Sequence, residues 1–223
     1  KGGIASMVYA LKCVQETGIQ LKGDVTLEST IEEEDGGIGG TLATILRGYS
    51  ADAAIITEST DEYNVGIASA GAMYFRVKVI GKPAHAAYAH LGVNAIGKAI
   101  KIYNALSELN KKRQAKISYP PAEIYPYMKG HATTINMGKI SGGDWPSTVA
   151  GWCELECRIG WPPREKLEEV KEQIEHTIET AAKRDPWLRK NPPNIEWFGW
   201  RAEPHEQDVN HPIVQTVANF VKE

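Results

Sequence analysis

Residues 29–41 read STIEEEDGGIGGT, and this stretch decides how the chain is organised. Three glutamates, Asp35 and two glycine pairs follow residues 25–31, where apolar and polar side chains alternate as they do in a β-strand. Leu42, Ile45 and Leu46 then recur at the three-and-four spacing of an amphipathic helix. The sequence therefore places the carboxylates at the end of a strand, where ligands bind in open α/β sheets.

A second apolar run, AAIIT at residues 53–57, is typical of a strand that is covered on both faces, as in a parallel sheet. Strand, helix and strand in this order form a right-handed unit, so both strands end at the same edge of the sheet. Glu58 directly follows the second strand. We therefore expect Glu58 to lie beside Glu32, Glu33 and Glu34.

Composition excludes several classes of protein. A net charge of -3 over 223 residues gives no electrostatic footprint for nucleic acid. The apolar runs are too short to span a bilayer, and no charged-then-apolar leader opens the chain, so no membrane partner is expected. Three cysteines without paired spacing fit a reducing compartment, which predicts a cytoplasmic protein. Because the chain starts at Lys1 without an initiator Met, we expect it to be an internal piece of a longer protein.

The residues after Gly66 follow another pattern. Residues 73–80 (MYFRVKVI) alternate apolar and polar side chains, which favours an antiparallel sheet with one face in water. Further strands are predicted at 133–140, 152–159 and 194–200, and helices at 94–109 and 164–183. The order is strand, helix, strand, strand, helix, strand. It predicts a ferredoxin-like α+β arrangement, in which two helices cover one face of a four-stranded antiparallel sheet.

These patterns predict an α/β protein with an inserted α+β domain. Residues 1–68 form the first part of a parallel-sheet domain, residues 69–201 form the inserted ferredoxin-like domain, and residues 202–223 return to the first domain.

An ordered set of motifs resembles a known family of enzymes. The chain is similar to the dinuclear-zinc amidohydrolases and exopeptidases, which include acetylornithine deacetylase, succinyl-diaminopimelate desuccinylase, aminoacylase and carboxypeptidase G. The acetylornithine deacetylase-like branch fits best. The matching stretches are KGG at 1–3, EEEDGGIGG at 32–40, ITEST at 56–60, GKPAHAAYAHLGVNAI at 81–96 and TTINMGKISGGDWPSTVAGWCELECRIG at 133–160.

The resemblance implies catalytic and metal-binding roles for four residues. Glu33 matches the family's general base, and Glu34 matches a carboxylate that binds one zinc. Glu58 resembles the terminal carboxylate ligand of the other zinc. His85 resembles the histidine of the inserted domain that reaches across a dimer to polarise the scissile carbonyl.

Substrate, cofactor and partner follow from the same resemblance. Asn136 and Arg158 match positions that hold a substrate carboxylate. The implied substrate is a small N-acyl amino acid or peptide, and the implied cofactor is a pair of divalent ions, zinc or else cobalt or manganese. The inserted domain would act as a lid and form a homodimer.

The residue types suit amide hydrolysis on chemical grounds as well. Zinc held by carboxylate and imidazole lowers the pKa of bound water to about 7. A carboxylate that is not a ligand, here Glu33, can accept the water proton and pass it to the leaving amine. Neighbouring strand residues point apart, so Glu33 and Glu34 need the conformational freedom of Gly36 and Gly37.

Other functions stay open. The family's histidine ligands have no match in these 223 residues, and carboxylates without imidazole make a poor zinc site, so this chain alone is expected to be inactive. A noncatalytic dimerisation or binding module that pairs through a sheet edge is the alternative. A magnesium phosphohydrolase is disfavoured because the sequence lacks a phosphate-cradling glycine loop with its Lys and Ser/Thr.

Overall fold

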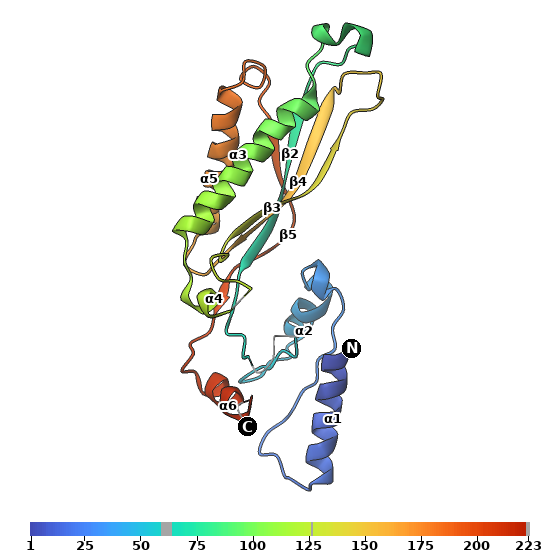
Figure 1. The fold of residues 1–223 in the computed structure, drawn as a ribbon. Helices are drawn as coiled ribbons and strands as arrows, with labels where there is room; N and C mark the ends of the chain where they lie inside the picture. The colour runs from blue at the N-terminus through green and yellow to red at the C-terminus, as the bar shows by residue number, and fades with distance from the viewer. Residues whose placement is uncertain (59–63, 126, 222–223) are drawn as a thin grey trace. The chain divides into compact units, whose positions relative to one another are not determined.

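The chain divides into two compact units in a computed structural model that describes residues 1–58, 64–125 and 127–221 (Figure 1). One unit comprises residues 68–206, and the other comprises residues 1–67 and 207–223. Every helix in the described part of the chain is too short or too polar to span a bilayer.

The unit of residues 68–206 is built on one antiparallel sheet. Its strands lie in the order β3-β4-β2-β5, and helices α3 and α5 lie side by side over one face (Figure 1). The chain order confirms the predicted strand, helix, strand, strand, helix, strand arrangement. The elements are β2 (Gly71–Ile80), α3 (Ala95–Lys116), β3 (Thr134–Gly142), β4 (Trp152–Trp161), α5 (Leu167–Lys183) and β5 (Asn194–Ala202). A small antiparallel pair joins β1 (Ala68–Ser69) to β6 (His205–Glu206).

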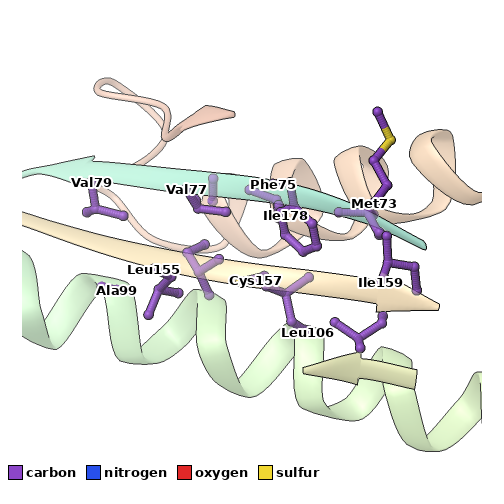
Figure 2. Packing of buried hydrophobic residues seen from close by; sticks show 14 of the residues in the cluster. Met73, Phe75, Val77, Val79, Ala99, Leu106, Leu155, Cys157, Ile159 and Ile178 are labelled. Carbon is purple, nitrogen blue, oxygen red and sulfur yellow. The ribbon is translucent and has the colours of Figure 1, made fainter. Parts of the chain in front are cut away.

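The core of this unit lies between the sheet and the two helices. Every second residue of β2 and β4 points toward α3 and α5, as Figure 2 shows for Phe75, Val77 and Leu155, and these three side chains are fully buried. Burial of one such side chain stabilises the fold by roughly 1.5–3 kcal/mol. The intervening residues of both strands therefore face away from the helices.

A buried carboxylate ties α3 to the segment that follows α5. Asp185 accepts hydrogen bonds from the ammonium groups of Lys98 and Lys101 and from the backbone N–H groups of Trp187 and Leu188. Burial would by itself raise the pKa of the Asp185 carboxyl. The hydrogen bonds from Lys101, Lys98, Leu188 and Trp187 outweigh burial and lower that pKa below its usual range.

Helix α3 runs seven residues beyond its predicted end at 109. The reason is Arg113, which is 3% exposed and donates hydrogen bonds to Thr133, Gln173 and Glu165. These contacts hold the last turns of α3 against β3 and α5. A short helix, α4 (Pro120–Ile124), then begins with proline at its first position, where no backbone N–H is needed.

In the unit of residues 1–67 and 207–223, the regular secondary structure among the described residues is helical, and the strand prediction needs correction. Neither residues 25–31 nor residues 53–57 are hydrogen-bonded into a sheet, so the predicted parallel pair is not formed. A parallel sheet requires cover on both faces, whereas Val25 is 54% and Ile56 is 85% exposed. The helices are α1 (Gly2–Glu16), the short helices η1 (Glu33–Asp35) and η2 (Ile38–Leu42), α2 (Ala43–Leu46) and α6 (Pro212–Val221).

Candidate functional site

The turn that carries the three glutamates depends on left-handed backbone conformations. Gly36 has φ +90° and Gly37 has φ +68°, which glycine adopts without strain. Glu32 has φ +61°, which is uncommon for a residue with a side chain, and its carbonyl accepts the N–H groups of Asp35 at 3.2 Å and Gly37 at 2.7 Å. Glu33, Glu34 and Asp35 form η1 and are all exposed, so the carboxylates of Glu33 and Glu34, predicted for catalysis and metal binding, face solvent.

The second glycine pair lets the backbone pass closely over the start of this turn. The N–H of Gly39 donates to a carboxylate oxygen of Glu32 at 3.2 Å. A Cβ atom at Gly39 would collide with that carboxylate, and one at Gly40 would collide with the carbonyl of Ile31. Close backbone packing therefore requires a glycine at Gly40, whereas at Gly39 the exposed Glu32 side chain could move aside. The hydrogen bond from Gly39 gives Glu32 a role in folding the turn.

Helix α1 meets the segment that precedes Glu58. A Cβ atom at Gly3 would lie 2.5 Å from the hydroxyl oxygen of Thr57, so only glycine allows this approach. This contact gives the glycine of the KGG motif a packing role beside a predicted ligand. The side chain of Glu58 is exposed.

The residues that the structure describes do not assemble the expected metal site. Among the described residues, no three His, Cys, Asp or Glu side chains gather closely enough to hold a metal ion. Glu58 therefore does not complete a metal-binding group with Glu33 and Glu34, because the parallel strands that would align their ends are not formed. A zinc site needs about four donors, usually with imidazole among them, so these residues alone do not fit a dinuclear centre.

His85 lies in a loop that is held on both sides. It forms a β-bridge with Thr148, and the next residue, Ala86, donates its N–H to the carbonyl of Ser147 at 2.8 Å. The His85 side chain caps the short helix η3 (Ala86–Leu91): its Nδ1 accepts the N–H of Ala87 at 3.2 Å. Because Nδ1 is an acceptor, the proton of the neutral ring lies on Nε2. The exposed ring thus presents one hydrogen-bond donor.

The structure brings together the two residues predicted to hold substrate. Asn136 on β3 and Arg158 on β4 are direct cross-strand partners, and Arg158 is in turn paired with Tyr74 on β2. All three belong to the face of the sheet that the helices leave uncovered, because their neighbours along the strands are buried in the core. Phe198 on β5 continues this row beyond Tyr74.

Two arginines on this face have different electrostatic surroundings. Arg76 forms ion pairs with Glu154 at 3.2 Å, Glu156 at 3.1 Å and Glu196 at 3.2 Å, and its hydrogen bond lowers the pKa of the Glu156 carboxyl. Arg158, in the next row, forms no ion pair with any residue that the structure describes. Its guanidinium is therefore available to a ligand, whereas that of Arg76 is already neutralised.

Comparison with known proteins settles the family. The family model of the M20 peptidase dimerisation domain matches residues 67–186, which is more than half of the chain. The chain belongs to the M20 family. Apart from its first residue, Ile67, the match lies in the unit that carries Asn136, Arg158 and His85. It agrees with the resemblance to amidohydrolases and exopeptidases.

Curated M20 relatives include proteins named for the removal of acyl groups. The chain is 32% identical to an N-formyl-4-amino-5-aminomethyl-2-methylpyrimidine deformylase from Bacillus subtilis, over 89% of this chain and 47% of the relative. It is 28% identical to an acetylornithine deacetylase from Vibrio cholerae, over 71% of this chain and 43% of the relative. The chain thus spans about half the length of the relatives it matches.

Solved M20 structures share the fold. A tripeptidase from Staphylococcus aureus matches 96% of this chain and 51% of its own, with a TM-score of 0.66 at 22% identity. The aminopeptidase PepT from Bacillus cereus gives a TM-score of 0.57 at 20% identity, with the same coverage.

Sequence reasoning missed the aromatic part of the uncovered sheet face. Tyr74 is the cross-strand partner of Arg158, and the rings of Phe198 and Trp200 lie against Tyr74, but the sequence predicted only a strand position for Tyr74. The alternation in residues 73–80 already placed Tyr74 on the polar face of its strand. What was lacking was the pairing register between β2, β4 and β5.

Proposed function

We propose that this chain is part of an enzyme that hydrolyses an amide bond and releases an amine from an N-acyl substrate. The observation that carries the proposal is the cross-strand pair of Asn136 and Arg158 on the uncovered face, in a chain of the M20 family. The relatives named deformylase, deacetylase and desuccinylase support the same reaction class.

The residues take distinct roles in this proposal. Glu33 accepts a proton from the attacking water and delivers it to the leaving amine. The Nε2–H of His85 donates to the carbonyl oxygen, on which negative charge develops in the transition state. Arg158 and Asn136 hold the polar end of the substrate, because a guanidinium and an amide together bind a carboxylate or a ring heteroatom.

Metal dependence belongs to the proposal as well. Glu34 and Glu58 are the candidate ligands for two divalent ions, zinc or else cobalt or manganese. Since the described residues do not form such a site by themselves, we propose that the remaining ligands come from outside these 223 residues. The isolated chain is then expected to bind no stoichiometric zinc and to hydrolyse no amide.

Two substrate classes are supported to different degrees. N-acyl amino acids or small peptides follow from the deacetylase and peptidase relatives. An N-formylated aminomethylpyrimidine is the second candidate, because the deformylase relatives match 89% of the chain at 30–32% identity.

Assembly and location complete the proposal. We propose a homodimer formed through residues 68–206, since β3 is an edge strand with unpaired backbone groups in a domain described as a dimerisation domain. A noncatalytic dimerisation module is the alternative. A reducing, cytoplasmic location is proposed because Cys13, Cys153 and Cys157 are all free thiols.

The test introduces Glu33→Gln into the full-length protein. Glu28→Gln, which changes another exposed carboxylate, is the matched control. We expect Glu33→Gln to lower kcat by roughly 10²–10⁴ with little change in substrate binding, because only proton transfer is lost. Glu28→Gln should retain full activity. Wild-type rates in the Glu33→Gln protein would refute the assigned role, and a metal-loaded full-length protein that hydrolyses no N-acyl substrate would favour the noncatalytic module.

A further inference from the structure

An aromatic cluster adjoins the proposed substrate residues on the uncovered sheet face. The ring of Tyr74 meets that of Trp200 edge-on, with centroids 5.3 Å apart and planes at 75°, and lies 6.1 Å from that of Phe198. All three side chains are half-buried although the helices cover the opposite face. Tyr74 is also the direct cross-strand partner of Arg158.

A local irregularity in β5 places Trp200 against Tyr74. The β2–β5 register shifts between the pair Tyr74 and Phe198 and the pair Ala72 and Ala202. Gly199, in this shifted stretch, has φ +70°, a backbone conformation that favours glycine, and a Cβ atom there would be in van der Waals contact with the Tyr74 ring. A bulge of this kind redirects side chains and is common beside functional sites.

The three rings are not equally available to a ligand. The guanidinium of Arg76 lies 4.6 Å from the centroid of the Phe198 ring, so that ring already has a cation–π partner. The edge of the cluster next to Arg158 is formed by Tyr74, with Trp200 against it. The guanidinium of Arg158, which has no ion-pair partner in the part of the chain that the structure describes, therefore lies directly beside an aromatic surface.

We propose that Tyr74 and Trp200 form an aromatic wall that selects substrates with a planar ring, while Arg158 and Asn136 bind the polar or anionic group of the same molecule. The inference rests on the proposed function and narrows its substrate class to N-acylated amines that carry an aromatic ring. An aromatic ring offers the edge-to-face and stacked contacts that an aliphatic group of similar size lacks.

The first test compares two ligands on the unmodified 223-residue chain. N-acetylphenylalanine and N-acetylleucine share an acyl group and a carboxylate and differ in the ring. We expect the phenylalanine probe to shift the indole N–H resonance of Trp200 and to bind about three- to tenfold more tightly. Equal affinities, or no shift of that resonance, would overturn the proposal.

The second test removes each part of the site. Trp200→Leu and Tyr74→Leu should each abolish the preference for the aromatic probe, while Trp145→Leu, at a tryptophan that is 68% exposed on the β3–β4 connection, should preserve it. Arg158→Gln should weaken both probes equally. Loss of the preference in Trp145→Leu, or unchanged binding in Arg158→Gln, would place the probes elsewhere and overturn the inference.

These results can be separated from those on the reaction itself. If the full-length protein hydrolyses N-acyl substrates without preferring aromatic ones, the wall is refuted and the proposed function stands. If the preference is found but Glu33→Gln retains full hydrolysis, the wall stands and the catalytic assignment fails.

Discussion

Residues 68–206 and residues 1–58 both carry regularly spaced apolar side chains, but they differ in what covers them. In the first region, Phe75, Leu155 and Ile159 are fully buried under two helices. In the second, Gly40 is the one buried residue among those described, and side chains such as Ile31 and Ile56 are 69% and 85% exposed. The apolar period predicts a strand in both regions, yet only the region that supplies its own partners forms one.

The difference also separates two kinds of site residue. Asn136 and Arg158 are fixed by a hydrogen-bonded register inside a packed sheet. Glu33 and Glu34 are placed by a local turn, and their relation to Glu58 depends on a sheet that this chain does not build by itself.

The largest expected effect is on amide hydrogen exchange. Central amides of β2 and β4 should exchange only through global unfolding, which slows them by roughly 10³-fold or more. Amides in 25–31 and 53–57 should exchange nearly as in an unfolded chain, because they lie in no sheet ladder. Hydrogen exchange followed by NMR on the 223-residue chain measures the rates in both regions. Comparable protection of the two sets of amides would contradict the difference in cover between the two regions.

Truncation of one apolar side chain in each region should give the next largest difference. Phe75→Ala should lower the free energy of unfolding by about 3–5 kcal/mol, because it leaves a cavity in the core. Ile56→Ala, at a side chain that is 85% exposed, should change it by less than about 0.5 kcal/mol. The free energies are measured by denaturant unfolding, followed through a spectroscopic signal of the β-sheet. Similar losses of unfolding free energy in the two variants would contradict the comparison.

The buried Asp185 predicts a pH dependence confined to the packed unit. Its carboxyl has a lowered pKa in the folded state, so its stabilisation is complete above the unfolded value of about 4 and is lost as the pH falls below it. Asp185→Asn should cost about 2–3 kcal/mol at neutral pH and flatten this acid dependence.

Glu108→Gln serves as the matched control, because the ion pair of Glu108 with Lys111 is exposed on α3 and its loss should change stability little. An unchanged acid profile in Asp185→Asn would assign the dependence to other carboxylates.

The smallest expected effect concerns the ring of His85. Nitrogen-15 NMR should find the neutral ring protonated on Nε2, because Nδ1 accepts the Ala87 N–H. Ala87→Pro removes that donor in the first turn of η3, where proline is tolerated, and should give a mixture of tautomers. The ring of His90 gives an internal reference in the same spectra, and protonation of His85 on Nδ1 in the unmodified chain would refute the arrangement.

The fold of residues 68–206 could be read from the chain because each strand and helix there repeats its apolar residues with the period of its own structure. The extension of α3 to residue 116 could not be predicted from the sequence, because it depends on the buried Arg113, whose hydrogen-bond partners lie up to 60 residues away. The turn at Gly36 and Gly37 was predictable from glycine chemistry, and both residues have positive φ. The hydrophobic period of residues 25–31 shows only which face of a strand would be apolar. A sheet also needs neighbouring elements that cover this face, and without them the predicted parallel strands do not form.

The amino-acid sequence by itself determined the family and the sheet-and-helix order of residues 68–206, because motif spacing and hydrophobic period are local properties of the chain. Only the tertiary structure decided that Asn136, Arg158 and Tyr74 form one row. It also decided that, within residues 1–58, 64–125 and 127–221, Arg76 pairs with carboxylates while Arg158 does not. Those facts depend on strand register, which sets the neighbours of each side chain across β-strands that lie far apart in sequence.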